Sequence, residues 1–165
     1  MTTDGGTATV LLPEYEEWLE RVSATYQSVT FCCLHRLGDR ALAERVALQV
    51  VAGLIGKPTI FKYYGLPYSG RIARLAERRI AEAKEGRLAA GGSTWAELFA
   101  ELVKVSRADQ EVLCLACVQN YGDDQLAATL GCDEQQAGDR RARTIDLFAG
   151  LSRRALPAEG ADEEG

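Results

Sequence analysis

Apolar residues recur at helical spacing along most of this 165-residue chain. The pattern predicts a first helix over about 14–37 and a second over about 40–55. Gly38 suits the end of the first helix, and Asp39 can cap the second. Nothing in the sequence alternates in the manner of a strand, so we predict an all-α fold. The later predicted helices cover about 68–84, 94–105, 106–120, a short segment before Gly131, and about 134–148.

Composition shifts divide the chain into two helical modules. The segment GRLAAGG at 86–92 contains three glycines among small residues, which is typical of a linker. The Gly/Thr-rich start and the acidic, Pro/Gly-bearing end favour solvated disorder. The predicted organisation is a disordered N-terminus at 1–12, a helical domain at 13–85, a linker at 86–93, a second helical domain at 94–154 and an acidic disordered tail at 155–165.

The second domain ends in the element order of a helix-turn-helix. A capped apolar helix from Ser106 precedes a short amphipathic helix, a turn at Gly131 and an Arg-bearing amphipathic helix. In this motif the second helix can lie in the DNA major groove. Gln side chains can bond adenine edges, and Arg can bond guanine or phosphate. The candidate DNA contacts on this helix are Gln135, Gln136, Arg140 and Arg143.

Charge weighs against strong DNA binding by this domain alone. The chain has a formal net charge of −5. Residues 123–154 contain six acidic and five basic side chains, a net charge of −1. Asp139 would repel phosphate, and Gly138 weakens a helix interior by roughly 1 kcal/mol. A helix-turn-helix used for packing or protein contact is therefore a serious alternative.

These modules together resemble a small bacterial sigma factor of the extracytoplasmic-function (ECF) group, within the sigma-70 class. The resemblance covers about 14–151 and is strongest in VSRADQEVLCLACVQNYGDDQLAATLG. In the first module, LHRLGDRALAERVALQVVAGL is similar to the family's paired helices, with matching spacing from Gly38 to Glu44. RIARLAERRI resembles the family's strand-separating helix.

The resemblance implies a role in transcription initiation, with RNA polymerase core and promoter DNA as partners. The first module would dock on a polymerase coiled coil and capture unpaired promoter bases, and the second would read a more distant element. An anti-sigma factor is a further candidate partner, and no cofactor is implied. The implied polymerase-contact positions carry Glu44, Arg45, Leu48 and Gln49. Arg45 reverses the charge that the family places there, which opposes docking on a basic surface.

The implied single-strand contacts lie around the strand-separating helix. Tyr64 and Tyr68 could stack on bases, at about 1–3 kcal/mol per base. Arg71 and Arg74 could follow phosphates. Alternatively, the tyrosines close the small core of the first module, and the mixed Arg and Glu residues form a solvated, ion-paired face.

Two other interpretations stay open. The departures at Arg45, Gly138 and Asp139 favour a degenerate sigma-like regulator that acts by protein–protein contact without melting promoters. A thiol or zinc sensor would use Cys114 and Cys117, with Cys32, Cys33 or His35, although this CxxC lies in an apolar helical run that favours packed thiols.

The residue content and the motifs of the sequence disfavour an enzyme and a membrane protein. His35 is the only histidine, and phosphate-loop, nucleophile-elbow and HExxH motifs are missing from the sequence. The sequence has no apolar run of about 18 residues and no basic export signal, so we expect a cytoplasmic protein that does not enter the membrane.

Overall fold

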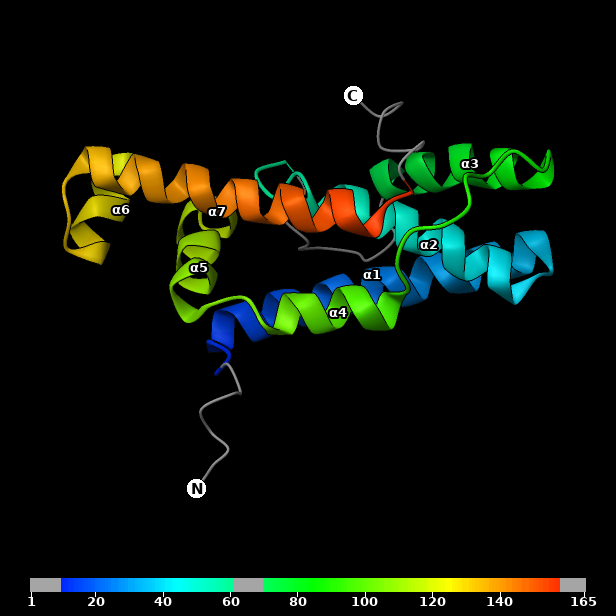
Figure 1. Ribbon diagram of the computed structural model, residues 1–165, viewed down its shortest axis with the longest axis horizontal. Helices are drawn as coiled ribbons and strands as arrows, with labels where there is room; N and C mark the ends of the chain where they lie inside the picture. The colour runs from blue at the N-terminus through cyan, green and yellow to red at the C-terminus, as the bar shows by residue number, and fades with distance from the viewer. Residues whose placement is uncertain (1–9, 61–69, 158–165) are drawn as a thin grey trace, which may run out of the picture.

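The computed structural model describes residues 10–60 and 70–157, and within these ranges the chain is helical with no strand. This confirms the predicted all-α fold. Figure 1 shows an elongated arrangement in which α6 lies at one end and α3 lies in the other half. The helices in chain order are α1 Pro13–Leu37, α2 Arg40–Ile55, α3 Gly70–Lys84, α4 Trp95–Val103, α5 Arg107–Val112, a π-helical segment Leu113–Val118, α6 Asp123–Leu130 and α7 Glu134–Ala155.

The corner between α1 and α2 forms as the sequence predicts. Gly38 adopts φ +69°, and its N–H donates to the carbonyl of Leu34 at 2.8 Å. Asp39 then caps α2, because its carboxylate accepts from the N–H of Leu42 at 3.1 Å. A glycine at positive φ followed by an acidic cap reverses the chain, so that α1 and α2 pack side by side.

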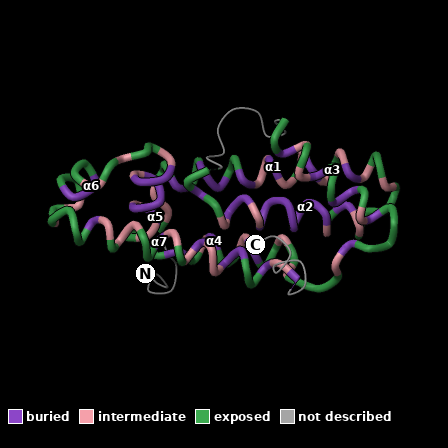
Figure 2. Tube along the Cα trace, turned by 90° about the horizontal axis from the view of Figure 1, so that it is seen from above, coloured by how far each residue is buried: buried purple, intermediate pink, exposed green. Residues whose placement is uncertain are grey.

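Helix α2 is the central helix of the fold. It packs against α1, α3 and the C-terminal half of α7, and ten of its sixteen residues are buried. Figure 2 shows this nearly continuous burial. At the contact with α7, a Cβ added to Gly56 would lie 2.8 Å from the Cβ of Ser152, so the two helices approach closely here.

The two predicted modules share one hydrophobic cluster. Trp18 of α1 packs edge-on against Phe148 of α7, with ring centroids 5.7 Å apart. Tyr26 of α1 stacks on Trp95 of α4 at 4.5 Å. A second cluster joins α1, α2 and α3 within the first module. The larger cluster therefore crosses the predicted boundary between the domains.

The predicted linker at 86–93 is packed rather than free of contacts. Leu88 is buried, and the Ala89 carbonyl accepts from Gln49 Nε2 at 3.0 Å. The Ser93 N–H donates to the Ala155 carbonyl at 2.9 Å, and a Cβ on Gly92 would come within 2.5 Å of the same carbonyl oxygen. Gly92, one of the three glycines that suggested flexibility, thus permits a close approach between this segment and the end of α7.

Both segments predicted to be disordered, 1–12 and 155–165, include residues that the structure packs against the core. The Leu12 N–H donates to Gln110 Oε1 at 2.8 Å, and Leu11 packs against the core. At the other end, Ala155 belongs to α7 and is buried, as is Pro157. Core contacts that are distant in sequence hold these residues, and composition does not report such contacts. The remaining predicted disorder, at 1–9 and 158–165, lies outside the described residues.

The predicted helix over 106–120 changes type along its length. After Val112 the backbone becomes π-helical, and the Gln119 N–H donates to the carbonyl of Cys114, five residues back, at 2.9 Å. Asn120 then takes φ +66°. Within the described ranges, no helix is both long enough and apolar enough to cross a bilayer.

Candidate nucleic-acid interface

The strongest candidate interface is the outer face of the N-terminal half of α7. A three-residue turn at 131–133 joins α6 to α7, and Gly131 at its start takes φ +75°. The N–H groups of Gly131 and Cys132 both donate to the Ala127 carbonyl, at 2.8 and 3.0 Å. Asp133 caps α7 by accepting from the N–H of Gln136 at 2.8 Å. Local turn chemistry therefore fixes where α7 begins.

Side-chain contacts hold the inner face of α7. Arg141 forms an ion pair with Asp123 of α6, and its Nη2 donates to the Tyr121 carbonyl at 2.8 Å. Thr144, which is 1% exposed, donates to Asp109 Oδ1 of α5 at 2.8 Å. Ala137, Thr144 and Phe148 are buried on this side of α7, whereas Ala142 is exposed.

The four predicted DNA contacts on α7 lie outside its buried stripe. Gln135, Gln136 and Arg143 are exposed, and Arg140 is half-buried. However, Gln136 Oε1 accepts from the Asp133 N–H at 3.1 Å, which completes a capping box. A bidentate contact with adenine needs both the oxygen and the nitrogen of the amide. The cap occupies one of the two lone pairs of that oxygen and restricts the orientation of the amide, so it competes with an adenine contact by Gln136.

Acidic side chains surround this face. Asp124, Glu134 and Asp139 are exposed beside the two arginines. Gly138 lies against α6, because a Cβ built on it would sit 3.4 Å from Asp123 Oδ2. The exposed part of α7 around Arg140 and Arg143 therefore has little net positive charge to attract phosphate.

Of the four predicted polymerase-contact residues on α2, two are at least partly exposed and two are buried. Glu44 is exposed, and its Oε2 lies 3.8 Å from Arg40 Nη1. Arg45 is half-buried. Leu48 and Gln49 are only 4% and 2% exposed. Leu48 belongs to the cluster shared with the second module, and Gln49 bonds the segment at 86–93. In this arrangement Leu48 and Gln49 are therefore inaccessible to a partner, since packing between the modules covers this side of α2.

The predicted single-strand contacts are only partly described. Arg71 and Arg74 are exposed on α3, whereas Tyr64 and Tyr68 lie outside the described residues. Helix α3 and the first half of α7 occupy different halves of the molecule, so the two sets of candidate contacts form separate faces (Figures 1 and 2).

Arg79 of α3 is buried, unlike Arg71 and Arg74. It is 7% exposed, and its Nη1 lies 3.3 Å from Glu82 Oε1. The signal was present in the sequence, because Arg79 follows Ile72 by seven residues and Ala76 by three, and so falls on the apolar stripe.

Three of the five cysteines are packed thiols, and Cys32 and Cys132 are partly buried. Cys33, Cys114 and Cys117 are buried. Burial raises the pKa of the Cys33 and Cys114 thiols to about 12. His35 is exposed, and its ring lies edge-on to the ring of Phe31, with the ring centroids 4.8 Å apart. The described residues contain no cluster of three or more His, Cys, Asp or Glu side chains suited to a metal ion.

Comparison of the chain with known protein families, with curated proteins and with solved structures gives no match. The resemblance to ECF sigma factors rests on the sequence motifs and on the order of the helices.

Proposed function

We propose that this chain is a sigma-factor-like transcription protein that associates with RNA polymerase core and contacts promoter DNA through α7. The observation that carries the proposal is the exposure of Gln135 and Arg143, with Arg140 half-buried, on a capped helix behind a glycine turn. Anchoring of the inner face through Arg141 and Thr144 keeps the outer face fixed.

The charges set the expected strength of the DNA contact. Each neutralised phosphate contributes a slope of about −0.9 to the dependence of log K on log salt. With Arg140 and Arg143 as the cations on this face, the slope for α7 alone is about −2. Arg71 and Arg74 would bring the whole chain to about −4 if α3 also engages DNA. Unaided binding is therefore weak, and polymerase supplies the rest of the affinity.

Docking on α2 through all four predicted residues requires a rearrangement. Glu44 and Arg45 are reachable, but Leu48 and Gln49 become accessible only when α7 and the segment at 86–93 leave α2. We propose that the described arrangement is the form without polymerase, and that docking exchanges the α2–α7 contact for a polymerase contact.

The test combines polymerase capture with promoter binding. Tagged full-length chain is mixed with bacterial core polymerase, and the complex is assayed for promoter retention over a salt series. Arg140→Glu with Arg143→Glu should abolish promoter binding and leave polymerase capture unchanged. Lys104→Glu with Arg107→Glu makes the same charge change at exposed positions outside α7 and serves as the control. Failure to capture core polymerase at micromolar chain would reject the initiation role.

A second candidate function is a sigma-like regulator that works by protein contact, with an anti-sigma factor or polymerase as partner and without promoter melting. Burial of Leu48 and Gln49, and the use of Gln136 in the cap, favour it. It predicts polymerase or anti-sigma binding with no salt-dependent DNA retention. It also predicts that the Arg140→Glu, Arg143→Glu variant keeps its regulatory activity.

A further inference from the structure

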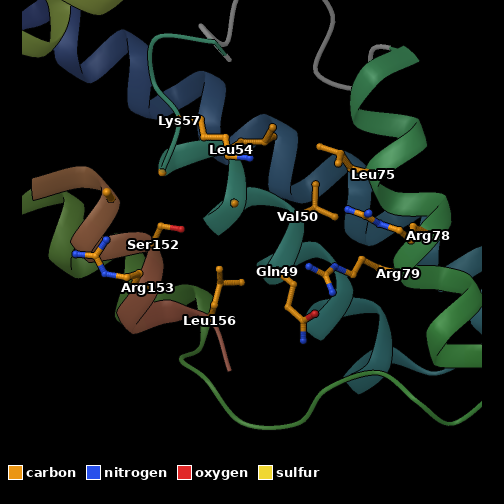
Figure 3. Close-up of a pocket in the computed structure, with 13 residues that line it drawn as sticks. Gln49, Val50, Leu54, Lys57, Leu75, Arg78, Arg79, Ser152, Arg153 and Leu156 are labelled. Carbon is orange, nitrogen blue, oxygen red and sulfur yellow. The ribbon is translucent and has the colours of Figure 1, made fainter. Parts of the chain in front are cut away.

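A cavity of about 350 Å³ lies where α2, α3 and α7 meet (Figure 3). Its apolar wall includes Val50 and Leu54 of α2, Leu75 of α3 and Leu156 just after α7. This volume falls within the range of small-molecule sites in proteins. Both predicted modules contribute to the wall, so an occupant would touch both of them.

A buried hydrogen-bond acceptor lines this cavity. Gln49 is 2% exposed, and its Nε2 donates to the Ala89 carbonyl at 3.0 Å, which fixes the amide orientation. Its Oε1 has no hydrogen-bond partner among the described residues. Buried polar atoms in native proteins nearly always have a partner. Gln49 Oε1 is therefore an acceptor at the edge of the cavity wall that a ligand N–H or O–H, or a single water, can satisfy.

The polar part of the wall is cationic. Lys57, Arg78, Arg79 and Arg153 line the cavity, and no acidic residue is among the described lining residues. Arg78 and Arg79 reach from α3 toward the middle of the site, whereas Arg153 points outward from α7 (Figure 3). Arg79 is 7% exposed and keeps its contact with Glu82. A buried guanidinium beside an unpartnered amide oxygen favours an anionic ligand that also carries a donor.

Gly53 keeps the α2 side of the cavity open. It lies within a helix, where glycine is unfavourable, and a Cβ added to it would meet nothing within 4 Å. The empty space beside Gly53 is large enough for a side chain, and a ligand can use it instead.

We propose that this cavity binds a small amphipathic anion, with an apolar body against Val50, Leu54 and Leu75, an acidic group near Arg78 and Arg79, and a donor to Gln49 Oε1. This site is independent of any DNA contact by α7. Because the ligand touches α2, α3 and α7 together, it stabilises their packed arrangement.

The probe for this site is 8-anilino-1-naphthalenesulfonate, which combines a sulfonate, an aromatic body and one N–H donor. Its fluorescence is titrated with the folded full-length chain. We expect saturable binding to one site. The neutral analogue N-phenyl-1-naphthylamine keeps the N–H but lacks the sulfonate. Its affinity should be lower by about tenfold or more. Equal affinity for the two probes, or binding that does not saturate, would overturn the proposal.

Variants locate the bound probe. Gly53→Leu fills the cavity and should reduce affinity by about tenfold or more. Ala41→Leu adds the same side chain at an exposed position of the same helix and should bind like the wild type. Gln49→Leu removes the acceptor, and Arg79→Gln removes the buried charge, so each should weaken binding. Circular dichroism and thermal midpoints check that every variant is folded. Wild-type affinity in folded Gly53→Leu would show that the probe binds elsewhere and would end the proposal.

Discussion

The hydroxyl of Tyr15 donates a 2.7 Å hydrogen bond to the backbone carbonyl of Leu102. The two residues lie 87 positions apart, on α1 and α4, and both are fully buried. This bond joins the first helix of one predicted module to the first helix of the other. The chain therefore folds with the two modules sharing a core.

Replacing Tyr15 with Phe should test that shared core. The ring stays and the hydrogen bond is lost, so the free energy of unfolding should fall by about 0.5–1.5 kcal/mol. Urea denaturation followed by tryptophan fluorescence and by circular dichroism should give coincident transitions in both proteins, because one cluster spans the modules. Two separated transitions in the wild type would contradict the shared core.

The same tyrosine predicts how stability depends on alkaline pH. Burial is the largest cause that raises the pKa of Tyr15 above its ordinary value of 10.0. In the unfolded chain the phenol ionises near that value, whereas in the folded chain it stays protonated. Its contribution is therefore complete below pH 10 and is lost as the pH rises above it. Wild-type stability should fall more steeply between pH 10 and 11 than that of Tyr15→Phe, as measured by urea titration at each pH.

The contact between α2 and α7 predicts a pair of compensating substitutions. In Gly56→Ala, the new Cβ would lie 2.8 Å from Ser152, so the helices must shift apart. We expect a loss of about 1–3 kcal/mol, the usual range for overpacking. Adding Ser152→Gly removes the clash, and a double-mutant cycle from thermal or urea unfolding should recover part of that loss. Strictly additive effects would mean that the two helices do not meet here.

The sequence predicts the helices well because their signals are local. Gly38 and Asp39 mark the corner between α1 and α2 through backbone conformation and capping, and both act within a few residues. The burial of Gln49 and the packing of 86–93 could not be predicted in this way. Those features depend on where α7 lies, and α7 is about 90 residues further along the chain.

The candidate site was predictable in direction but not in detail. Helical periodicity agrees with the exposure of Gln135 and Arg143 on α7, whereas Arg140 is half-buried. The use of Gln136 in the cap could also be predicted from the sequence, because Asp133 precedes it by three residues, which is the spacing of a capping box. The burial of Leu48 depends on packing between the modules, and helical periodicity alone cannot identify which neighbour covers an apolar face.

Gly138 predicts a stabilising substitution near the proposed DNA face. It lies within α7 and does not adopt a positive φ, and a Cβ built on it would lie 3.4 Å from Asp123 Oδ2. Gly138→Ala should therefore raise the free energy of unfolding by about 0.5–1 kcal/mol, because alanine loses less backbone entropy than glycine in a helix. Urea unfolding measures the gain. A decrease in stability would show that α6 and α7 are packed more closely here than the contact distance indicates.

Thiol reactivity separates packed cysteines from a redox or metal-sensing pair. Burial raises the pKa of Cys114 to about 12, so at pH 8 roughly one thiol in 10⁴ is ionised, and the thiolate is the form that reacts. Cys132 is only partly buried and provides the comparison within the same chain. Timed alkylation by iodoacetamide, read by peptide mass spectrometry, should modify Cys132 well before Cys114 in the folded protein. In concentrated urea the two rates should become similar, because the environment of Cys114 is lost. Rapid native alkylation of Cys114 would instead support the thiol-sensor interpretation.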